Sequence, residues 1–212
     1  MSEGSSEASS KALELERLVF FSDAVMAIAI TLLAIDIRLP EAAHGAGGLA
    51  PWLADLWPKI IGFLVSFWVI ALYWLAHHRC YRYIRNYNRR LVYLNFLFLM
   101  FVAFLPFPTS VLFSFSPETI SVVLYAGTAA GMGLSLFWVW SYALRHGYVS
   151  EAATPALIRD LRLNLLLPPL VFVISCIVAL FSAAAGMLVW FLIIPVYIYR
   201  RVTEGALEGS LS

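Results

Sequence analysis

The sequence predicts an all-α integral membrane protein with six transmembrane helices. Of its 212 residues, 62% are hydrophobic and only 13% are charged, and the mean hydropathy is +0.84. In soluble domains about a quarter of the residues are charged. The apolar runs are long and do not alternate with polar residues, so they favour membrane-spanning helices over strands.

A helix needs about 20 predominantly apolar residues to cross a bilayer, and six segments approach this length. The first predicted span, residues 18–37, follows a polar N-terminus, and residues 1–13 are expected to form a disordered cytoplasmic tail. The second span follows a loop rich in proline and glycine, and short polar segments separate the later ones. In chain order, spans two to six are predicted over residues 60–77, 91–113, 120–144, 163–181 and 183–199.

The basic residues predict the orientation of these spans. With the N-terminus in the cytoplasm, all but two of the 14 Lys and Arg residues, Arg38 and Lys59, fall on the cytoplasmic side. Cytoplasmic loops carry an excess of positive charge, so both termini, including a short tail at residues 201–212, are expected to be cytoplasmic. An odd number of spans would spoil this distribution. The sixth span is the shortest, and a re-entrant hairpin is its alternative.

The run HHRCYRYIRNYNRR, residues 77–90, interleaves arginines with aromatic side chains, as some nucleic-acid-binding segments do. It directly follows a predicted span. Contact with anionic membrane lipid is therefore the favoured interpretation, and no nucleic-acid partner is expected.

Motifs of several enzyme and transport classes are absent from the sequence. It contains no HExxH, no GxSxG, no phosphate-binding loop and no dinucleotide fingerprint. Cys80 and Cys176 lie in no metal or redox spacing, and the potassium-filter sequence TVGYG is missing. An enzyme is therefore not expected, and neither is a metal or another cofactor.

The first predicted span carries an aliphatic stripe. On a helical wheel, Phe21 shares one face with the aliphatic residues Ile28, Leu32 and Ile35, and Ala24 and Thr31 lie at its flanks. Lipid exposure is the ordinary explanation of such a stripe. If copies of this helix met at an axis, the same side chains would form hydrophobic rings of the kind that gate a channel by dewetting. Asp36 would then lie near the outer mouth of the pore and could attract cations.

A polar cluster lies near the cytoplasmic end of the same span. It contains Arg17, Ser22 and Asp23, and on the wheel the aspartate lies about 140° from the stripe. His77 and Asn95 from the next two spans lie at the same depth and are candidate partners of Asp23, because an unpaired charge in a membrane is costly. A hydrogen-bonded tie between three helices is the favoured interpretation. The alternative is a proton-coupled secondary transporter that uses Asp23 and His77 as a relay.

The polar cluster is part of a longer pattern. Arg17-x-x-x-Phe21-Ser22-Asp23, followed by AVMAIAITLLAIDI, resembles the signature of the transmembrane protein 175 family, which are potassium channels of endosomes and lysosomes with shorter prokaryotic relatives. LPFPTSVL, residues 105–112, is similar to a segment in the third span of prokaryotic members. The resemblance covers residues 14–200, which are expected to form one six-span channel domain.

The resemblance implies a homotetramer in a prokaryotic plasma membrane, with the first helix of each subunit lining a central potassium pore. Counted from the FSD motif, the narrowest hydrophobic ring falls on Ile28, further rings fall on Leu32 and Ile35, and Thr31 supplies a hydroxyl layer. The Arg and FSD residues of the family are tied to neighbouring helices beside the pore. The implied function is passive conduction of potassium, the permeant ion rather than a cofactor.

Overall fold

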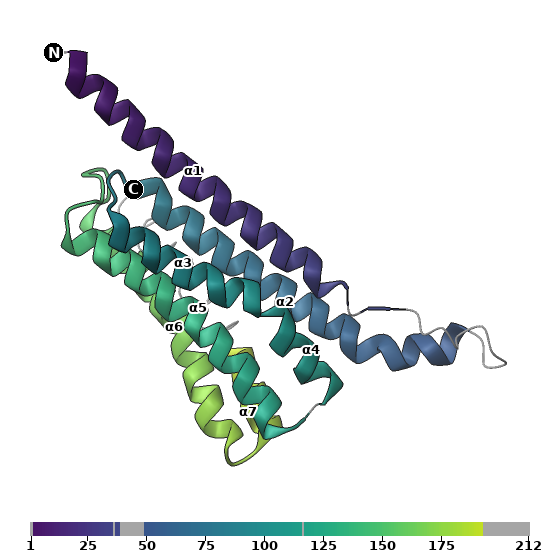
Figure 1. Cartoon of the computed structure of the whole chain (residues 1–212). Coiled ribbons are helices and arrows are strands. Elements are labelled where there is room, and N and C mark those ends of the chain that lie inside the picture. The colour runs from purple at the N-terminus through teal and green to yellow at the C-terminus, as the bar shows by residue number, and fades with distance from the viewer. Residues whose placement is uncertain (1, 36, 39–48, 116, 193–212) are drawn as a thin grey trace, which may run out of the picture.

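The protein is a bundle of helices, and the predicted all-α class is confirmed (Figure 1). The computed structural model describes residues 2–35, 37–38, 49–115 and 117–192. The helices of this part of the chain are α1 (Ser2–Leu33), α2 (Leu49–Tyr83), α3 (Arg89–Phe104), α4 (Pro106–Ser114), α5 (Thr119–Arg145), α6 (Pro155–Ala179), α7 (Ala183–Val189) and the 3-10 helix η2 (Trp190–Leu192).

Four segments of the described chain are long and apolar enough to cross a membrane, judged by length and composition. They are Leu56–Tyr83, Arg89–Ser114, Thr119–Arg145 and Pro155–Ala179, and they coincide with predicted spans two to five. The apolar part of α1 ends at Leu33 and is therefore shorter than predicted. Ala183–Leu192 is a shorter apolar segment, and the rest of the predicted sixth span lies outside the described residues.

Helix α1 differs from the sequence-based expectation at its N-terminus. It begins at Ser2, so most of the segment 1–13, expected as a disordered tail, is helical. Figure 1 shows this end of α1 projecting beyond the other helices. The segment contains Ala, Leu, Glu and Lys, which are strong helix formers, and extending an existing helix is far easier than nucleating a new one.

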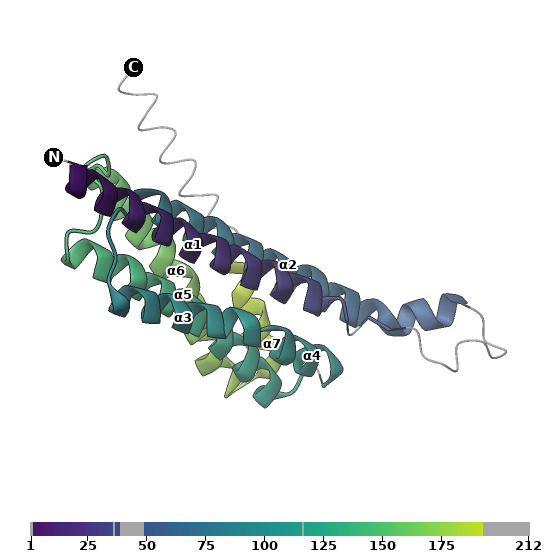
Figure 2. The same ribbon diagram turned by 45° about the horizontal axis from the view of Figure 1, so that its top comes forward.

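Helix α5 lies at the centre of the bundle. It packs against α3 and α6, whereas α1 packs against α2, α3 and α4, and Figure 2 shows α1 and α2 running side by side. In its apolar stretch 61% of the residues of α5 are buried, against 28% for α2 and α6. Glycines permit this close packing: a Cβ at Gly131 would lie 2.6 Å from Phe101, and one at Gly133 would lie 2.8 Å from Pro169. Gly127, by contrast, faces open space.

The third predicted span is divided between α3 and α4. The division falls at Leu105, because Pro106 has no amide hydrogen with which to continue the helix. The first turn of α4 carries Thr109 into a buried polar cluster, where its hydroxyl lies 2.9 Å from that of Ser66. The Ser66 hydroxyl also lies 3.1 Å from the Tyr125 hydroxyl, so α2, α4 and α5 are joined inside the apolar layer.

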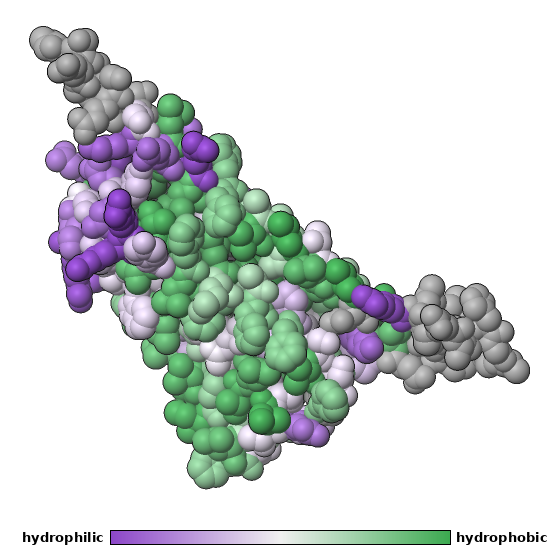
Figure 3. Space-filling view, in the orientation of Figure 1, coloured by the Kyte–Doolittle hydropathy of each residue, from purple (hydrophilic) through white to green (hydrophobic). Residues whose placement is uncertain are grey.

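The arginine-rich helix ends gather at one end of the molecule. α2 ends there, α3 begins there, and the loop between α5 and α6 closes over the same region. The amide of Arg85 donates to the Tyr148 carbonyl at 2.8 Å, and the amide of Ser150 donates to the Tyr83 carbonyl at 2.8 Å. Figure 3 shows a group of hydrophilic residues at this end and a mostly hydrophobic surface along the bundle. The two loops therefore form one polar end.

Candidate functional site

Helix α1 has one face packed inside the subunit. Ser22, Met26, Ala29 and Leu33 recur at intervals of three and four residues, and each is at most 4% exposed. This interval places them on one side of the helix, which lies against α2, α3 and α4. The residues on the opposite side have no such cover.

The predicted aliphatic stripe lies on the uncovered side of α1. Ile28 is 59% exposed, Ile35 is 48% exposed and Leu32 is 40% exposed. The Thr31 hydroxyl, also exposed, donates to the Ile28 carbonyl at 2.8 Å, which leaves the lone pairs of its oxygen available to water or a cation. Asp36, the predicted residue at the pore mouth, lies outside the described residues.

Phe21 marks the edge between the two faces of α1. It is 51% exposed, and its ring meets that of Phe96 on α3 edge to face, with 5.9 Å between the ring centroids. The aromatic contact gives α1 and α3 a fixed relative rotation near the polar cluster.

A buried hydrogen-bond chain joins α1, α3 and α2. The side-chain amide of Asn95 donates to the Ser22 hydroxyl at 2.9 Å, and the oxygen of the same amide lies 3.0 Å from Nε2 of His77. All three side chains are completely buried. The His77 ring is stacked against the rings of Tyr81 and Phe98, with centroid distances of 4.3 and 5.5 Å. The chain therefore holds the three helices together by polar contacts inside an apolar surrounding.

This chain of hydrogen bonds runs in one direction. Because the amide oxygen of Asn95 faces His77, Nε2 of the imidazole carries the hydrogen and donates it. Asn95 then donates to Ser22, and Ser22 donates to the Leu18 carbonyl at 2.8 Å. The chain ends on a backbone carbonyl, which does not titrate. The arrangement suits a structural tie better than a path for protons.

Asp23 has a different partner from the two predicted for it. The indole nitrogen of Trp74 donates to the Asp23 carboxylate at 2.8 Å, whereas His77 and Asn95 bond to each other. Successive residues on a helix are rotated by about 100°, so the carboxylate does not point where the neighbouring Ser22 hydroxyl points. It meets α2 about one turn before His77, at Trp74. The predicted tie between three helices is present, but its carboxylate contact was assigned to the wrong side chains.

The structure changes the membership of the predicted tie at two positions, Arg17 and Trp74. Arg17, predicted to belong to the tie, is exposed and forms no hydrogen bond or ion pair with the described residues, so the tie does not include it in this part of the chain. Although His77 and Asn95 were the candidate partners that the sequence suggested for Asp23, Trp74 belongs to the tie. Its spacing of one helical turn from His77 was the available signal.

The titratable side chains of the described residues form no group of three or more that could hold a metal ion. Cys80 and Cys176 are both free, and Cys80 is buried. Nothing in this part of the chain resembles a nucleophile with its base.

Comparison with known proteins identifies the family. The sequence profile of the family described as "Endosomal/lysosomal potassium channel TMEM175" matches residues 17–106, from the arginine of the RxxxFSD motif to the first residue of α4. A protein named potassium channel from Streptomyces collinus is 37% identical over 144 residues, which are 66% of this chain and 69% of that protein. The chain belongs to the transmembrane protein 175 family.

Other members of the transmembrane protein 175 family extend the match. A protein named potassium channel from Chamaesiphon minutus is 36% identical over 134 residues, which are 61% of this chain and 66% of that protein. The crystal structure of a lysosomal potassium-selective channel TMEM175 homolog from the same organism is similar to this chain with a TM-score of 0.74 at 27% identity, and the match covers 88% of this chain and 97% of that one. The similarity in fold thus reaches well beyond residues 17–106. These relatives are ion channels, not enzymes.

Proposed function

We propose that this member of the transmembrane protein 175 family forms a homotetrameric, potassium-permeable channel in which α1 of each subunit lines a central pore. One observation carries the proposal: α1 buries the face formed by Ser22, Met26, Ala29 and Leu33 inside the subunit and leaves Ile28, Leu32 and Ile35 uncovered. The names of the two bacterial relatives, both potassium channels, support the choice of ion.

Conduction would depend on rings formed by the stripe. Four copies of α1 around an axis would stack rings of Ile28, Leu32 and Ile35, with the Thr31 hydroxyls between them. An aliphatic ring offers no oxygen to replace the hydration shell of an ion, so a tight ring favours the ion that sheds water more easily, which is potassium rather than sodium. The Thr31 oxygens would partly compensate the lost water, and Asp36 would raise the local concentration of cations at the outer mouth.

The tie would fix the rotation of α1. The hydrogen bonds of Ser22 to Asn95 and of Asp23 to Trp74 hold two successive residues of α1 against α3 and α2. A rotation by one residue, about 100°, would turn the stripe away from the axis. The charged and polar residues of the cluster would therefore act by positioning the pore-lining side chains.

The distribution of basic residues and the sources of the relatives support an orientation and a membrane for the channel. The arginine-rich end would face the cytoplasm, which supports cytoplasmic termini and six spans, the sixth over residues 183–199. Residues 14–200 would form the channel domain and residues 201–212 a short tail. The bacterial source of the relatives supports a prokaryotic plasma membrane. Potassium and membrane lipid would be the partners, without a cofactor.

The contacts of the cluster weigh against the alternative of a proton-coupled transporter. Its relay would require Asp23 and His77 to exchange a proton, yet their hydrogen bonds go to Trp74 and Asn95 respectively. Neither partner side chain titrates in the physiological range, so no relay connects the two groups through them.

Potassium flux into liposomes that contain the purified protein tests the proposal. Ile28→Ala and Ile28→Asn should increase potassium flux and lower the preference for potassium over sodium, because each widens or wets the narrowest ring. The matched control is Ile177→Ala, since Ile177 is 55% exposed on α6, which does not pack against α1. If neither Ile28 variant alters flux or selectivity, the pore assignment is wrong. Flux that saturates and depends on a pH gradient would indicate the transporter instead.

A further inference from the structure

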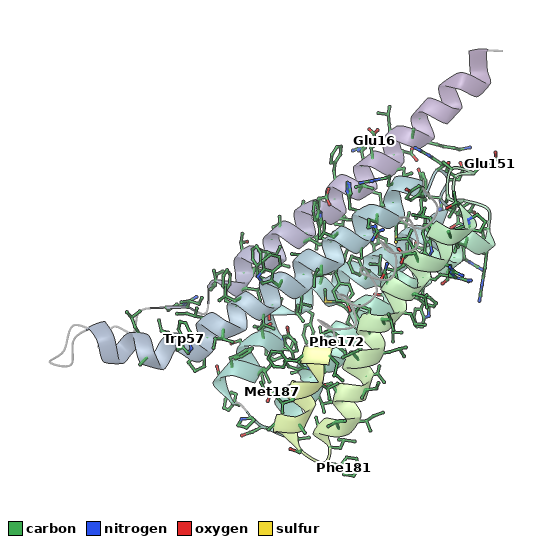
Figure 4. The ribbon with its side chains drawn as sticks, turned by 180° about the vertical axis from the view of Figure 1, so that it is seen from behind. Glu16, Trp57, Glu151, Phe172, Phe181 and Met187 are labelled. Carbon is green, nitrogen blue, oxygen red and sulfur yellow. The ribbon has the colours of Figure 1, made fainter. Side chains whose placement is uncertain are left out.

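A cleft of about 260 Å³ lies between α1 and the end of α2. Its α1 wall lies in the part of the helix that precedes the FSD motif, so the cleft is separate from the aliphatic stripe. Figure 4 labels Glu16 on this part of α1, at the same end of the molecule as Glu151 in the loop between α5 and α6. The cleft therefore belongs to the arginine-rich end.

The cleft has more positive than negative charge. Arg82 and Arg85 line it from α2 and the residues that follow, and Glu16 is the acidic residue among those that line it. Both arginines are exposed, and neither forms an ion pair with the described residues. Glu14 lies between the lining residues Ala12 and Leu15 but is not itself among the residues that line the cleft, and it already accepts a hydrogen bond from the Tyr87 hydroxyl. Two guanidinium groups against one carboxylate leave a net charge that an anion can balance.

The α1 wall of the cleft is apolar. Leu15, Val19 and Phe20 line it, and the Phe20 side chain is 68% exposed. These residues run toward the apolar part of α1, while Arg85 lies just beyond the last residue of the apolar segment Leu56–Tyr83. The cleft thus joins a positively charged end to an apolar wall at the level where the membrane-spanning segment of α2 ends.

We propose that this cleft binds an anionic phospholipid of the cytoplasmic leaflet. The phosphate of the headgroup would lie near Arg82 and Arg85, and an acyl chain would cover Val19 and Phe20. Guanidinium groups recognise phosphate through paired N–H donors, and apolar side chains favour hydrocarbon over water. A free phosphate would satisfy the arginines and leave the apolar wall exposed, so the lipid is the better fit. The proposal rests on the proposed orientation, with the arginine-rich end at the cytoplasmic side of the membrane, and is independent of ion conduction.

Native mass spectrometry of the purified full-length protein tests this site. The protein is titrated with phosphatidylglycerol and, separately, with phosphatidylcholine of the same acyl chains. Arg82→Gln/Arg85→Gln should weaken phosphatidylglycerol binding about 30-fold, since each cation near an anionic lipid contributes about fivefold. Glu16→Gln should strengthen it, because it removes the opposing charge. Arg159→Gln/Arg162→Gln, an exposed pair on α6 outside the cleft, is the matched control and should leave binding unchanged.

Any one of four results would overturn the proposal. An equal loss in both arginine pairs would mean diffuse attraction to the polar end rather than a site. Equal binding of phosphatidylcholine would mean that charge does not select the ligand. Complete displacement of phosphatidylglycerol by millimolar inorganic phosphate would mean that the apolar wall contributes nothing. The Glu16→Gln variant keeps the test decisive if the double arginine variant does not fold, because the proposal fails if that variant does not bind more lipid.

Discussion

Replacing the two partners of the His77–Asn95 hydrogen bond should reveal how strongly the buried chain holds the helices together. Asn95→Leu keeps a similar side-chain volume but leaves Nε2 of His77 without its acceptor. A buried donor without a partner costs about 1–3 kcal/mol in soluble proteins, while hydrogen bonds between membrane helices average about 0.6 kcal/mol and reach about 1.7. His77 and Asn95 are both completely buried by protein rather than by lipid, so a loss of about 1–2 kcal/mol is expected.

The companion variants separate the hydrogen bond from packing. His77→Phe places a phenyl ring in a site where the imidazole is already stacked against the rings of Tyr81 and Phe98. Alone it leaves the amide oxygen of Asn95 unpaired and should also destabilise the protein by about 1–2 kcal/mol. The double variant His77→Phe/Asn95→Leu removes both partners of the hydrogen bond between these two side chains. It should therefore be less destabilised than the sum of the two single variants, by about 1–2 kcal/mol.

The free energy of unfolding, measured in detergent for the three variants and the parent chain, is the assay for this cycle. Tyr93→Phe on α3 is a suitable control, because Tyr93 is 67% exposed and its hydroxyl is not part of the chain. Additive single effects would refute the reasoning, since they would mean that the two side chains do not interact. A double variant that is more destabilised than the sum would refute it as well.

Two further predictions concern the helix contacts. Trp74→Phe and Asp23→Asn should each reduce the yield of assembled protein on gel filtration more than they change the preference for potassium in the flux assay, because their contact positions α1; a normal assembly with altered selectivity would contradict this. Gly131→Ala and Gly133→Ala should lower the melting temperature, since a Cβ at either site would lie less than 3 Å from a neighbouring side chain, whereas Gly127→Ala should be neutral or slightly stabilising. Equal effects at all three glycines would mean that close helix approach is not the cause.

Much of the helix layout could be predicted, because membrane spans depend on local composition. Predicted spans two, four and five match α2, α5 and α6 with boundary differences, and span three is present with a division at its first proline. The composition of the N-terminal segment, residues 1–13, predicted disorder, whereas α1 begins at Ser2. The polar residues of this segment suggested disorder, but a short polar segment attached to a stable helix can extend that helix without forming a nucleus of its own.

For the candidate site, the two faces of a single helix were predicted correctly, whereas the contacts between helices were predicted only in part. The wheel separated Ser22 from Ile28 on α1, and the structure buries the first and exposes the second. The pairing across helices was only partly predicted. Asn95 and His77 were expected to contact Asp23 but bind Ser22 and each other, and the indole of Trp74 takes the carboxylate.

The sequence by itself determined the membrane class, the one-sided distribution of arginines and the two faces of α1. Each of these depends on residues within one segment or on the sign of charge beside it. Only the tertiary structure decided that Trp74 contacts Asp23, that α5 is the central helix, and that Arg82 and Arg85 share a cleft with residues 12–20 of α1. Such pairings depend on how far each helix is rotated and shifted against its neighbours. The periodicity of one helix does not reveal this rotation. A rotation of about 100° is enough to replace the side chain that faces a neighbouring helix by the next one in the sequence.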